Sequence, residues 1–402
     1  MDSNNVGGFA GLRERCDEIQ AALRELGLDG WLLYDLHARN SVAASLLGLG
    51  DLTRRYFVHL PAHGEPQAIV HGIEQAPWAQ WPWPKRVYVG WRELDAALRE
   101  TLAGARRIAM EVSAGDAVPS LDLVPAGVVE LVQAAGPEIA SSGELITRFY
   151  SRWTAEALAS HRRAAEVVAG VARDAFQHVA AAIEAGEEIT EGGLHAWVTA
   201  TLADRGCGVG ADCIAANGIH AADPHYAAVG AGAAFGRGDV ILLDLWGKES
   251  EDAIFADQTW MAYLGESVPD RVNEVWTAVR DARDGAVDFL RRQSAGGVAV
   301  QGSEVDDVAR GIIADRGFGA AFIHRTGHSI DRSLHGMGPN IDNLETRETR
   351  RLVAGVGFSI EPGIYLPGEL GIRSEINVYL GEDGPEVTPR NVQSEIFTLF
   401  GA

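Results

Sequence analysis

The chain has 402 residues, of which 47% are hydrophobic and 22% are charged, and its formal net charge is −22. This composition is typical of a globular protein, and the length predicts two domains rather than one core. The strong negative charge argues against a nucleic-acid partner, because binding to phosphates requires a clustered basic surface.

The sequence shows no sign of export or of membrane insertion. Residues 1–5 lack the basic segment of a secretory signal, and no run of eighteen apolar residues predicts a membrane span. The three cysteines, Cys16, Cys207 and Cys213, are odd in number and lack C-x-x-C spacing. They fit a reducing compartment, so we expect a cytoplasmic protein with no membrane partner.

The first 150 residues predict an α/β domain with its own sheet. Apolar patterns predict helices over residues 10–25, 92–103 and 143–149, and strands over 31–34, 56–58, 68–70, 87–89 and 108–110. The Pro/Trp-rich segment 77–84 predicts a loop, either packed on the surface or contacting a subunit or a site rim. No set of residues in this region indicates chemistry.

Near residue 150 the pattern changes, which predicts a domain boundary between 1–150 and 151–402. A long helix over 153–183 is followed by a shorter one capped by Thr190, and the pattern recurs with a long helix over 270–293 and a shorter one capped by Ser303. Both short helices end in Ala-Asp-Arg-Gly, at Gly206 and Gly317, and 317 − 206 = 111. We therefore expect two duplicated helix–helix–sheet halves, with the site where their sheets meet.

Acidic residues interrupt apolar strands in the first of these halves. Asp244 lies in the apolar run 239–245, and Asp257 lies in the run 253–260, with a turn expected between Gly247 and Asp252. Burying an acid is costly unless something pairs it, and a metal ion is one such partner.

The second half adds His328, with His335 seven residues later, and two more acids. Glu361 ends a predicted strand over 358–365, and Glu375 lies in a strand-like run over 371–378. Four carboxylates and one imidazole suit Mn²⁺, Co²⁺, Fe²⁺ or Zn²⁺ in a bridged pair. Two such ions about 3.5–4 Å apart can activate a shared water and polarise a carbonyl.

The order Asp, Asp, His, Glu, Glu, with its Gly-His and Ile-Glu-Pro-Gly-Ile-Tyr contexts, resembles the pita-bread metallopeptidases. These include methionine aminopeptidase, aminopeptidase P and prolidase, with creatinase as a metal-free relative. The resemblance covers residues 150–402, and residues 1–150 are similar to the smaller creatinase/prolidase-type domain in length and texture. It implies an α+β fold with a pita-bread catalytic domain after a smaller α/β domain. The extra domain disfavours methionine aminopeptidase, and the intact ligand set disfavours creatinase.

The resemblance also implies a role for each residue. Asp244 would chelate one metal, His328 and Glu361 the other, and Asp257 and Glu375 would bridge both. Glu361 would also shuttle the proton of the attacking water. His225 and His335 would stabilise the tetrahedral intermediate and handle the leaving nitrogen.

Four further residues are expected around the ligands. Arg373 would hydrogen-bond a ligand carboxylate, and Tyr365 would contact the substrate or a ligand side chain. His324 would either line the pocket or only pack. Arg347 resembles a prolidase arginine that grips the substrate carboxylate, with a solvated charged loop as the alternative.

The sequence departs from the family pattern at several positions. Asp257 follows Asp244 by thirteen residues, about two more than usual, and Trp260 replaces an arginine. Ser329 and Asp331 replace glycines, and Gly336 stands where glutamate is frequent.

The leading prediction is a dinuclear-metal hydrolase that cleaves Xaa-Pro peptide bonds through a metal-bound hydroxide, as an aminopeptidase P or a prolidase-like dipeptidase. We expect manganese as the favoured metal, a small peptide as substrate and a homodimer. The departures leave open a non-peptidase amidohydrolase or lyase of the same fold that acts on a small metabolite. A third alternative is a binding module without metal.

Overall fold

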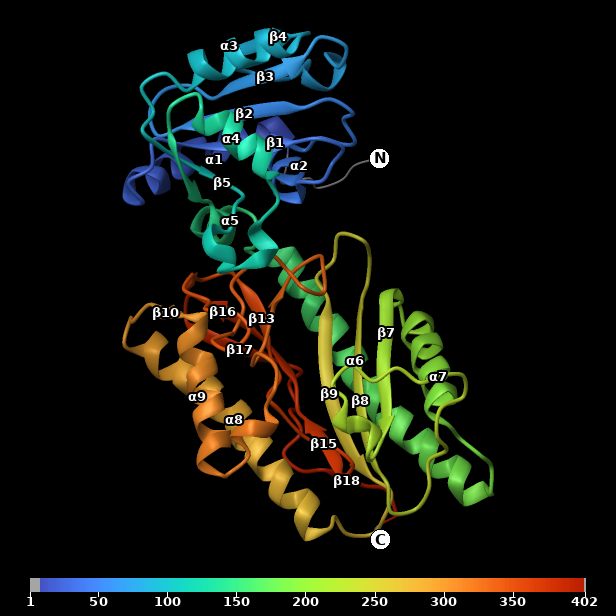
Figure 1. Cartoon of the computed structure of the whole chain (residues 1–402). Helices are drawn as coiled ribbons and strands as arrows, with labels where there is room; N and C mark the ends of the chain where they lie inside the picture. The colour runs from blue at the N-terminus through green and yellow to red at the C-terminus, as the bar shows by residue number, and fades with distance from the viewer. Residues whose placement is uncertain (1–7, 401–402) are drawn as a thin grey trace. The chain divides into compact units, whose positions relative to one another are not determined.

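The chain divides after Tyr150 into two units, residues 1–150 and 151–402 (Figure 1). The computed structural model describes residues 8–400, apart from the side chain of residue 116. Residues 1–5, in which the sequence shows no export signal, lie outside this range. Within residues 8–400, no helix is long and apolar enough to cross a membrane.

The first unit is built around a six-stranded sheet in the order β4-β3-β2-β1-β5-β6. Its strands are β1 (Gly30–Asp35), β2 (Tyr56–Pro61), β3 (Gln67–His71), β4 (Lys85–Tyr88), β5 (Arg107–Met110) and β6 (Glu138–Ser141). Its helices are α1 (Gly8–Glu25), α2 (Ser41–Leu47), α3 (Trp91–Thr101), α4 (Ala126–Gln133) and α5 (Gly143–Phe149). The central strand β1 pairs antiparallel with β2 and parallel with β5, and all its residues are buried. The predicted α/β unit is confirmed.

The Pro/Trp-rich segment 77–84 is a loop, as predicted. A 3₁₀ turn at Ala76–Trp78 begins it, and the indoles of Trp78 and Trp81 are buried. Phe9 stacks on Trp78 at a ring-centroid distance of 5.6 Å, and Trp81 meets Phe9 edge-on at 5.1 Å. This aromatic packing fixes a segment that has no ladder of backbone hydrogen bonds.

The second unit consists of two halves of the same design. The first half holds α6 (Ala155–Ala185), α7 (Glu191–Asp204), β7 (Val209–Asn217), β8 (Val240–Lys248) and β9 (Ala256–Tyr263). The second holds α8 (Asp270–Ala295), α9 (Gly302–Asp315), β11 (Ser329–Ile330), β13 (Gly357–Ile360), β14 (Gly363–Leu366), β15 (Leu370–Arg373), β16 (Ile376–Gly381) and β17 (Gly384–Thr388). Short strands complete it at β10 (Val300–Gln301), β12 (Arg351–Leu352) and β18 (Phe397–Thr398).

The duplication extends from sequence to packing. Helices α7 and α9 both have 14 residues, and their first residues, 191 and 302, are 111 apart. The buried apolar residues of α7 are Leu194, Val198 and Leu202, and those at the same offset in α9 are Val305, Ala309 and Ile313. Equivalent positions therefore face equivalent cores, which confirms the predicted repeat.

The caps of the two short helices agree with the prediction in one case only. Thr190 caps α7, because its side-chain oxygen accepts the N–H of Gly193 at 3.1 Å. The prediction that Ser303 caps α9 is wrong, since the helix begins at Gly302 and its cap is Gln301. The Gln301 N–H donates to Glu304 Oε2 at 2.7 Å, which closes a capping box. Gln301 is also the repeat equivalent of Thr190, 111 residues on.

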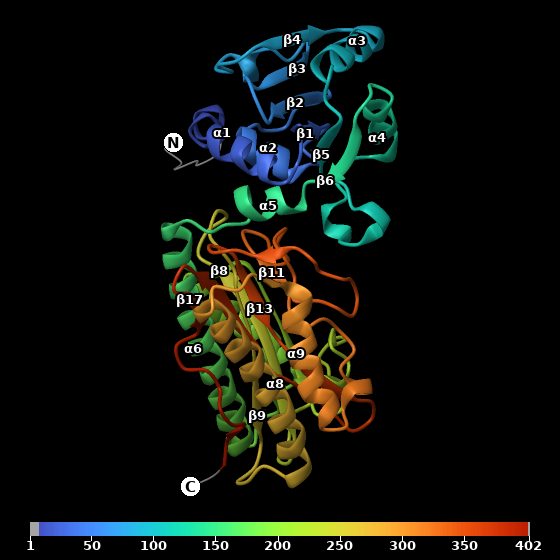
Figure 2. The ribbon, with the colours of Figure 1, turned by 90° about the vertical axis from the view of Figure 1, so that its left-hand side faces the viewer.

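Each half packs its helices on its own sheet. One core joins α6 and α7 to β7–β9, and another joins α8 and α9 to strands of the second half and to residues of β7–β9. Figure 1 shows the first helix pair beside β7–β9, and Figure 2 shows α8 and α9 side by side in front of β13. The halves meet along β9 and β16, where the Asn377 side chain donates to the Asp257 carbonyl (2.6 Å) and accepts the Asp257 N–H (3.0 Å).

The runs 358–365 and 371–378 are not continuous strands, and this part of the prediction is wrong. The first breaks into β13 and β14 at Glu361, because Pro362 has no N–H to continue the ladder. The second breaks into β15 and β16 at Ser374 and Glu375. Ile360 pairs with Ile376, and Gly363 pairs with Arg373, so both ladders share one register in which Glu361 stands opposite Glu375.

Candidate metal centre

The β8–β9 hairpin places the two aspartates on one face of a sheet. Asp244 pairs with Thr259, and Asp257 pairs with Trp246. Side chains alternate between faces along a strand, so these four residues point to the same side. The extra residues between the aspartates lie in the turn at 249–255, and they leave the two carboxylates on adjacent strands.

The second half brings Glu361, Glu375 and His328 to the same place. His328 lies just before β11, and its Nδ1 donates to the Ser329 carbonyl at 3.1 Å. A carbonyl only accepts, so a proton sits on Nδ1 and Nε2 points the other way. His328 Nε2 lies 3.3 Å from Asp257 Oδ2 and 3.4 Å from Glu361 Oε1.

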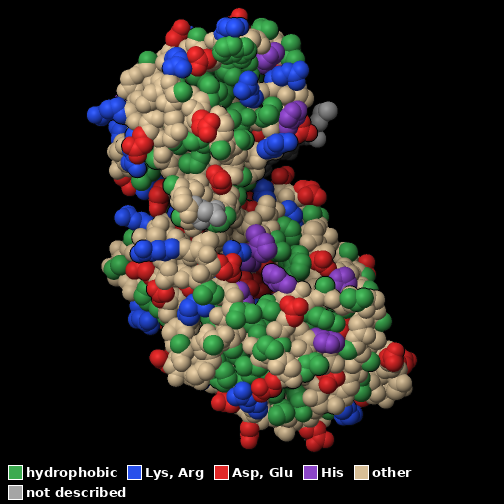
Figure 3. Space-filling view, in the orientation of Figure 1, with side chains coloured by type: hydrophobic (Ala, Val, Ile, Leu, Met, Phe, Trp, Pro, Cys, Tyr) green, Lys and Arg blue, Asp and Glu red, His purple; other side chains and the backbone are tan. Residues whose placement is uncertain are grey.

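The five candidate ligands line one cavity of about 250 Å³. Asp257, His328 and Glu375 each offer a ligand atom within 4.8 Å of the others, and all three are buried. Figure 3 shows histidine side chains gathered beside acidic ones at a hollow in the surface of the second unit. The prediction that the site lies where the two sheets meet agrees with this geometry.

Three carboxylate oxygens in the cavity are buried without a hydrogen-bond partner. They are Asp244 Oδ1, Asp257 Oδ1 and Glu375 Oε1. The other oxygen of Asp244 accepts from Arg373 Nη2 at 2.5 Å, and that of Glu375 accepts from Thr259 Oγ1 at 3.0 Å. Buried polar atoms without a partner are costly, and here they converge beside His328 Nε2. The residues therefore fit divalent cations as their missing partner.

Ionising these buried acids is unfavourable when no cation is present. Burial raises the pKa of Asp244 to about 7, with the charges of Asp257 and Glu361 adding to it against that of Arg373. Burial and the neighbouring carboxylates also raise the pKa of Glu375, and burial raises that of Asp257. Bound cations reverse this effect, because they favour the ionised carboxylates.

Glu361 behaves differently from the other three acids. Burial opposes its ionisation, but the charges of His328, His324 and Arg373 and a hydrogen bond from Ser359 Oγ (2.9 Å) outweigh it. The pKa of Glu361 therefore lies below its ordinary value. Ser359 Oγ also accepts the His328 N–H at 2.9 Å, so one hydroxyl holds both candidate ligands.

Arg373 links the candidate ligands to the surrounding structure. Besides Asp244, it donates to Thr259 Oγ1 (2.9 Å), the Pro224 carbonyl (3.1 Å) and the Tyr365 hydroxyl (3.2 Å). The Tyr365 hydroxyl lies 2.7 Å from His324 Nε2, and His324 Nδ1 lies 2.7 Å from the Arg325 carbonyl. Because that carbonyl accepts the Nδ1 proton, Tyr365 donates to Nε2, and a chain of hydrogen bonds runs from Arg373 to the Arg325 backbone.

His225 and His335 line the same cavity and are exposed. The ring of His335 meets that of His328 edge-on at 4.4 Å between centroids. Burial, with the charges of His328 and Arg325, lowers the pKa of His335 to about 4. His335 is thus a neutral imidazole near neutral pH. Arg347, in contrast, is exposed and is not among the cavity-lining residues.

Glu191, at the start of α7, was missed by the sequence reasoning. Its buried carboxylate accepts from Asn217 N (2.9 Å), His220 Nδ1 (2.8 Å), Tyr226 Oη (2.6 Å) and Ala233 N (2.7 Å). These donors flank His225 in the segment between β7 and β8. An acid in the first turn of a helix is usually a solvated partner of the helix dipole, so the sequence offered no signal for this role.

The departures from the family pattern lie outside the cavity. Trp260 is buried and donates to Gln258 Oε1 at 3.0 Å, and Ser329 donates its N–H to Asn340 Oδ1 at 3.0 Å. Asp331 accepts the N–H groups of Ser333 (2.6 Å) and Met337 (3.0 Å). A Cβ at Gly336 would lie 2.8 Å from Asp331 Oδ2, so the small residue and the aspartate fit together. These replacements support the local fold.

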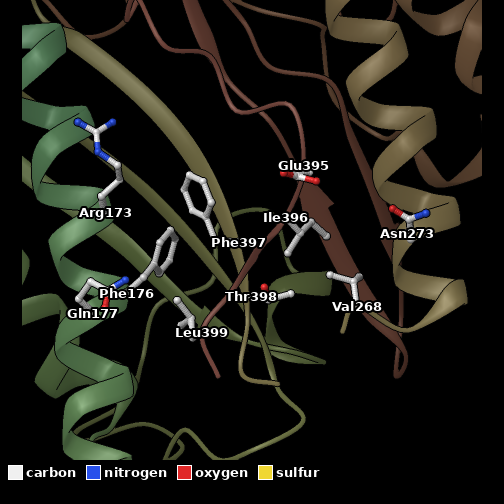
Figure 4. Close-up of a pocket in the computed structure, with 10 residues that line it drawn as sticks. All are labelled: Arg173, Phe176, Gln177, Val268, Asn273, Glu395, Ile396, Phe397, Thr398 and Leu399. Carbon is white, nitrogen blue, oxygen red and sulfur yellow. The ribbon is translucent and has the colours of Figure 1, made fainter. Parts of the chain in front are cut away.

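A larger cavity of about 630 Å³ lies elsewhere in the second unit, between α6 and the C-terminal segment (Figure 4). Phe176 and Phe397 lie side by side in it, with Arg173 above them. Glu395 is the one acid among its lining residues. We place the chemistry in the smaller cavity, because it brings four acids that could hold a metal together with histidines, whereas this larger one does not.

Comparison with known proteins agrees with this geometry. The model of metallopeptidase family M24 matches residues 159–382. The "Probable dipeptidase PepE" of Mycobacterium tuberculosis is 30% identical over 210 residues, which are 52% of either chain. The "Xaa-Pro dipeptidase" of Lactobacillus delbrueckii subsp. lactis is 36% identical over 146 residues, which are 36% of either chain. The matched part thus spans about half the length of these curated relatives, or less.

Solved structures match over nearly the whole chain. Dipeptidase PepE from Mycobacterium ulcerans superimposes with a TM-score of 0.73 and 25% identity, covering 97% of this chain and 98% of that one. The X-Pro aminopeptidase from Thermotoga maritima gives 0.61 and 24%, covering 94% and 99%. The fold is therefore the pita-bread fold preceded by a smaller α/β domain, as expected. With the family model matching more than half of its length, this chain belongs to metallopeptidase family M24.

Proposed function

We propose that this protein is a two-metal dipeptidase that hydrolyses Xaa-Pro dipeptides. The observation that carries the proposal is the set of three unpartnered carboxylate oxygens in one cavity with His328 Nε2. Asp244, Asp257, His328, Glu361 and Glu375 would hold the two metals. Four carboxylates and one imidazole form a hard donor set, which favours manganese over the softer alternatives.

When bound, the two cations would supply Lewis acidity, polarising the scissile carbonyl and making a water nucleophilic near neutral pH. Glu361 would accept the proton of that water, because it is an ionised carboxylate in the cavity and stands opposite Glu375. Arg373 would hold Asp244 in one orientation through their hydrogen bond. A histidine orientation fixed by Ser329 would present Nε2 to the centre without rearrangement.

The two exposed histidines would act on the substrate. His225 and His335 line the cavity on separate segments. One would stabilise the developing oxyanion and the other would protonate the leaving nitrogen of proline. The imidazole of His335, neutral near pH 7 because burial lowers its pKa to about 4, suits donation of a hydrogen bond rather than a charge.

The dipeptide preference rests on the cavity and on the relatives. The cavity of about 250 Å³ is small for a ligand pocket, since such pockets usually measure about 300–1,000 Å³. Ile214, Trp246 and Leu334 give it an apolar wall, which suits an apolar residue ahead of proline. Dipeptidase is the activity that the names of the PepE proteins and the Lactobacillus relative carry.

The alternative of an amidohydrolase or lyase gains no support from the site. It was motivated by Trp260, Asp331 and Gly336, and none of these residues lines the cavity. A metal-free binding module would not explain why these acids converge in one cavity.

The test is turnover of Leu-Pro and Leu-Pro-Gly by the purified protein. The protein would be stripped with a chelator, dialysed and reloaded with Mn²⁺, with Asp257→Asn as the control variant. We expect Leu-Pro cleavage that disappears on stripping and returns on reloading, with slower cleavage of the tripeptide. If the metal-loaded protein cleaves neither peptide, the proposal is wrong. Faster cleavage of Leu-Pro-Gly would instead identify an aminopeptidase, and size-exclusion with light scattering would test the expected homodimer.

A further inference from the structure

Two arginines line the cavity of the candidate metal centre, Arg325 and Arg373. Every guanidinium nitrogen of Arg373 is engaged, by Thr259, Pro224, Tyr365 and Asp244. A guanidinium committed in this way has no pair of donors left for a ligand. Arg373 is therefore a structural cation of the site.

Arg325 is held by its backbone, while its side chain is free. Its N–H donates to Glu345 Oε1 at 3.0 Å, and its carbonyl accepts from His324 Nδ1 at 2.7 Å. The next residue, Thr326, is buried and gives its N–H and hydroxyl to Asp306 Oδ1 at 2.9 and 2.6 Å. Among residues 8–400, the Arg325 guanidinium makes no hydrogen bond or ion pair.

The charge of Arg325 reaches the reacting region. Its side chain lines the same cavity as the five candidate metal ligands and His335. Glu345 also lines the cavity, but it forms no ion pair with Arg325. Two divalent cations would balance the negative charges of the four candidate ligand carboxylates. Arg325 would then be a positive charge on a fixed backbone without an anionic partner.

We propose that Arg325 binds a carboxylate of the peptide substrate, supplied by its C-terminus or by an acidic side chain. The inference rests on the proposed peptidase function. The five donors of a guanidinium match the two oxygens of a carboxylate in a bidentate pair. In a dipeptide the terminal carboxylate is one residue, about 3.5 Å of chain, from the scissile carbonyl, so it must lie in the same cavity.

Arg347 provides a matched control. It is the arginine that the resemblance to prolidases suggests for this role, but it is exposed and does not line the cavity. Replacing either arginine by glutamine removes one positive charge and keeps a long polar side chain. The two variants therefore differ mainly in the position of the lost charge.

The experiment compares wild type, Arg325→Gln and Arg347→Gln, each loaded with Mn²⁺. The substrates are two pairs that differ by one charge: Leu-Pro with Leu-Pro amide, and Glu-Pro with Gln-Pro. In wild type we expect kcat/KM to favour the carboxylate member of at least one pair by about 10- to 100-fold, as for a charge-assisted hydrogen bond. Arg325→Gln should reduce that preference at least about tenfold, mainly through KM, and Arg347→Gln should keep it.

The pair that loses its preference identifies the source of the carboxylate. Unchanged ratios in both pairs in Arg325→Gln would overturn the inference. So would an equal loss on all four substrates, or the same loss of preference in Arg347→Gln. Metal content and thermal unfolding of both variants should match wild type, which excludes a folding defect as the cause.

Failure of the proposed function would be distinguishable. Wild-type protein that cleaves none of these peptides contradicts the peptidase, whatever Arg325 does. The arginine is then tested by calorimetric titration of the Mn²⁺-loaded proteins with succinate. Binding at least about fivefold weaker in Arg325→Gln than in wild type and Arg347→Gln would support the inference, and equal affinity would overturn it.

Discussion

Buried acids occur in both units, and Glu111 of the first unit differs from the candidate metal ligands of the second in whether its oxygens have partners. In the first unit, Glu111 accepts from Trp31 Nε1 (2.6 Å), Asn40 Nδ2 (2.7 Å) and Ser142 Oγ (3.1 Å). In the second unit, Asp244 and Glu375 each leave one buried oxygen without a donor. Burial raises the pKa of all three acids, so burial alone does not separate them.

The number of partners is what distinguishes the two kinds of acid. A buried carboxylate with three donors ties the elements around it together. A buried carboxylate with a free oxygen beside other carboxylates destabilises the fold until a cation arrives. Asp35 in the first unit also leaves one buried oxygen, Oδ2, without a donor, so the convergence of several unpartnered oxygens, rather than a single buried acid, marks the candidate metal centre. The comparison also predicts opposite effects of neutralising the two kinds.

The largest expected effect is that of Glu375→Gln. Removing this charged oxygen should lower kcat for Leu-Pro by at least about 10³-fold, since a metal ligand carries several kcal/mol of transition-state stabilisation. The chelator-treated variant should unfold at the same temperature as wild type or a higher one, because repulsion between unpaired carboxylates is relieved. Turnover and thermal unfolding after chelation measure these two quantities, and elemental analysis measures the metal content.

Glu111→Gln is the control for this substitution, since it makes the same chemical change at a saturated acid. It should keep metal content and kcat. A Glu375→Gln protein that still binds two metals and turns over Leu-Pro at the wild-type rate would break the comparison.

The sequence predicted the residues of the candidate site better than the local structure around them. The five candidate ligands could be found because each lies in a strand-like run or a Gly-His context whose polarity conflicts with burial. The repeat could be found because Gly206 and Gly317 end matched helices. The breaks at Glu361 and Glu375 could not be found from the sequence. An apolar run has the same hydrophobic pattern whether or not Pro362 interrupts the backbone hydrogen bonds of its strand.

Long-range contacts were the other limit. Glu191 accepts hydrogen bonds from Tyr226 and Ala233, which lie more than thirty residues away in the sequence, and no local pattern predicts such pairs. The cap at Gln301 was missed since serine and threonine are the commoner capping residues. Arg325 was passed over for Arg347, because a charged residue in a sequence gives no sign of whether its partners are already supplied.

A saturated histidine in the second unit extends the comparison to pH. His161 Nδ1 donates to the Phe255 carbonyl at 2.7 Å, and Nε2 accepts from Thr388 Oγ1 at 2.8 Å. Burial lowers its pKa to about 4 from 6.5. As pH falls below 6.5, the unfolded chain takes up a proton that the folded protein refuses, so stability is present above pH 6.5 and is lost toward pH 4.

The His161→Gln variant isolates the pH-dependent contribution of His161 to stability, because the other titrating groups are the same in both proteins. From pH 7 to pH 4, wild type should lose about 3 kcal/mol more free energy of unfolding than the variant, at about 1.4 kcal/mol per pH unit. Urea unfolding at several pH values measures it. A difference between the two proteins that does not change with pH would show that His161 takes up its proton while folded.

The effect of Glu111→Ala should be confined to stability. Trp31, Asn40 and Ser142 would lose their shared acceptor, and leaving each such donor unsatisfied costs about 1–3 kcal/mol. We expect a lower urea midpoint with unchanged kcat and KM for Leu-Pro. A fall in kcat at full metal content would mean that the first unit acts on the reaction, and the separation of a structural acid from a catalytic centre would fail.

Glu191 combines a feature of each kind of acid. Its carboxylate is saturated like that of Glu111, yet its donors flank His225 at the cavity. Burial opposes its ionisation, but the hydrogen bonds from Tyr226, Ala233, Asn217 and His220 outweigh this and hold its pKa below the ordinary value. It is therefore an ionised acid whose partners are all supplied by the protein.

Glu191→Gln keeps the shape of the side chain but removes its charge and turns one oxygen into a donor. Because the segment carrying His225 loses acceptors, we expect kcat for Leu-Pro to fall about tenfold, as for groups that orient catalytic residues, with metal content unchanged. Steady-state kinetics beside metal analysis measures both, and Glu111→Gln again serves as the control. If Glu191→Gln lowers stability alone, a saturated acid is structural wherever it lies. If it lowers kcat with both metals in place, a saturated acid acts on the reaction through the segment that it holds.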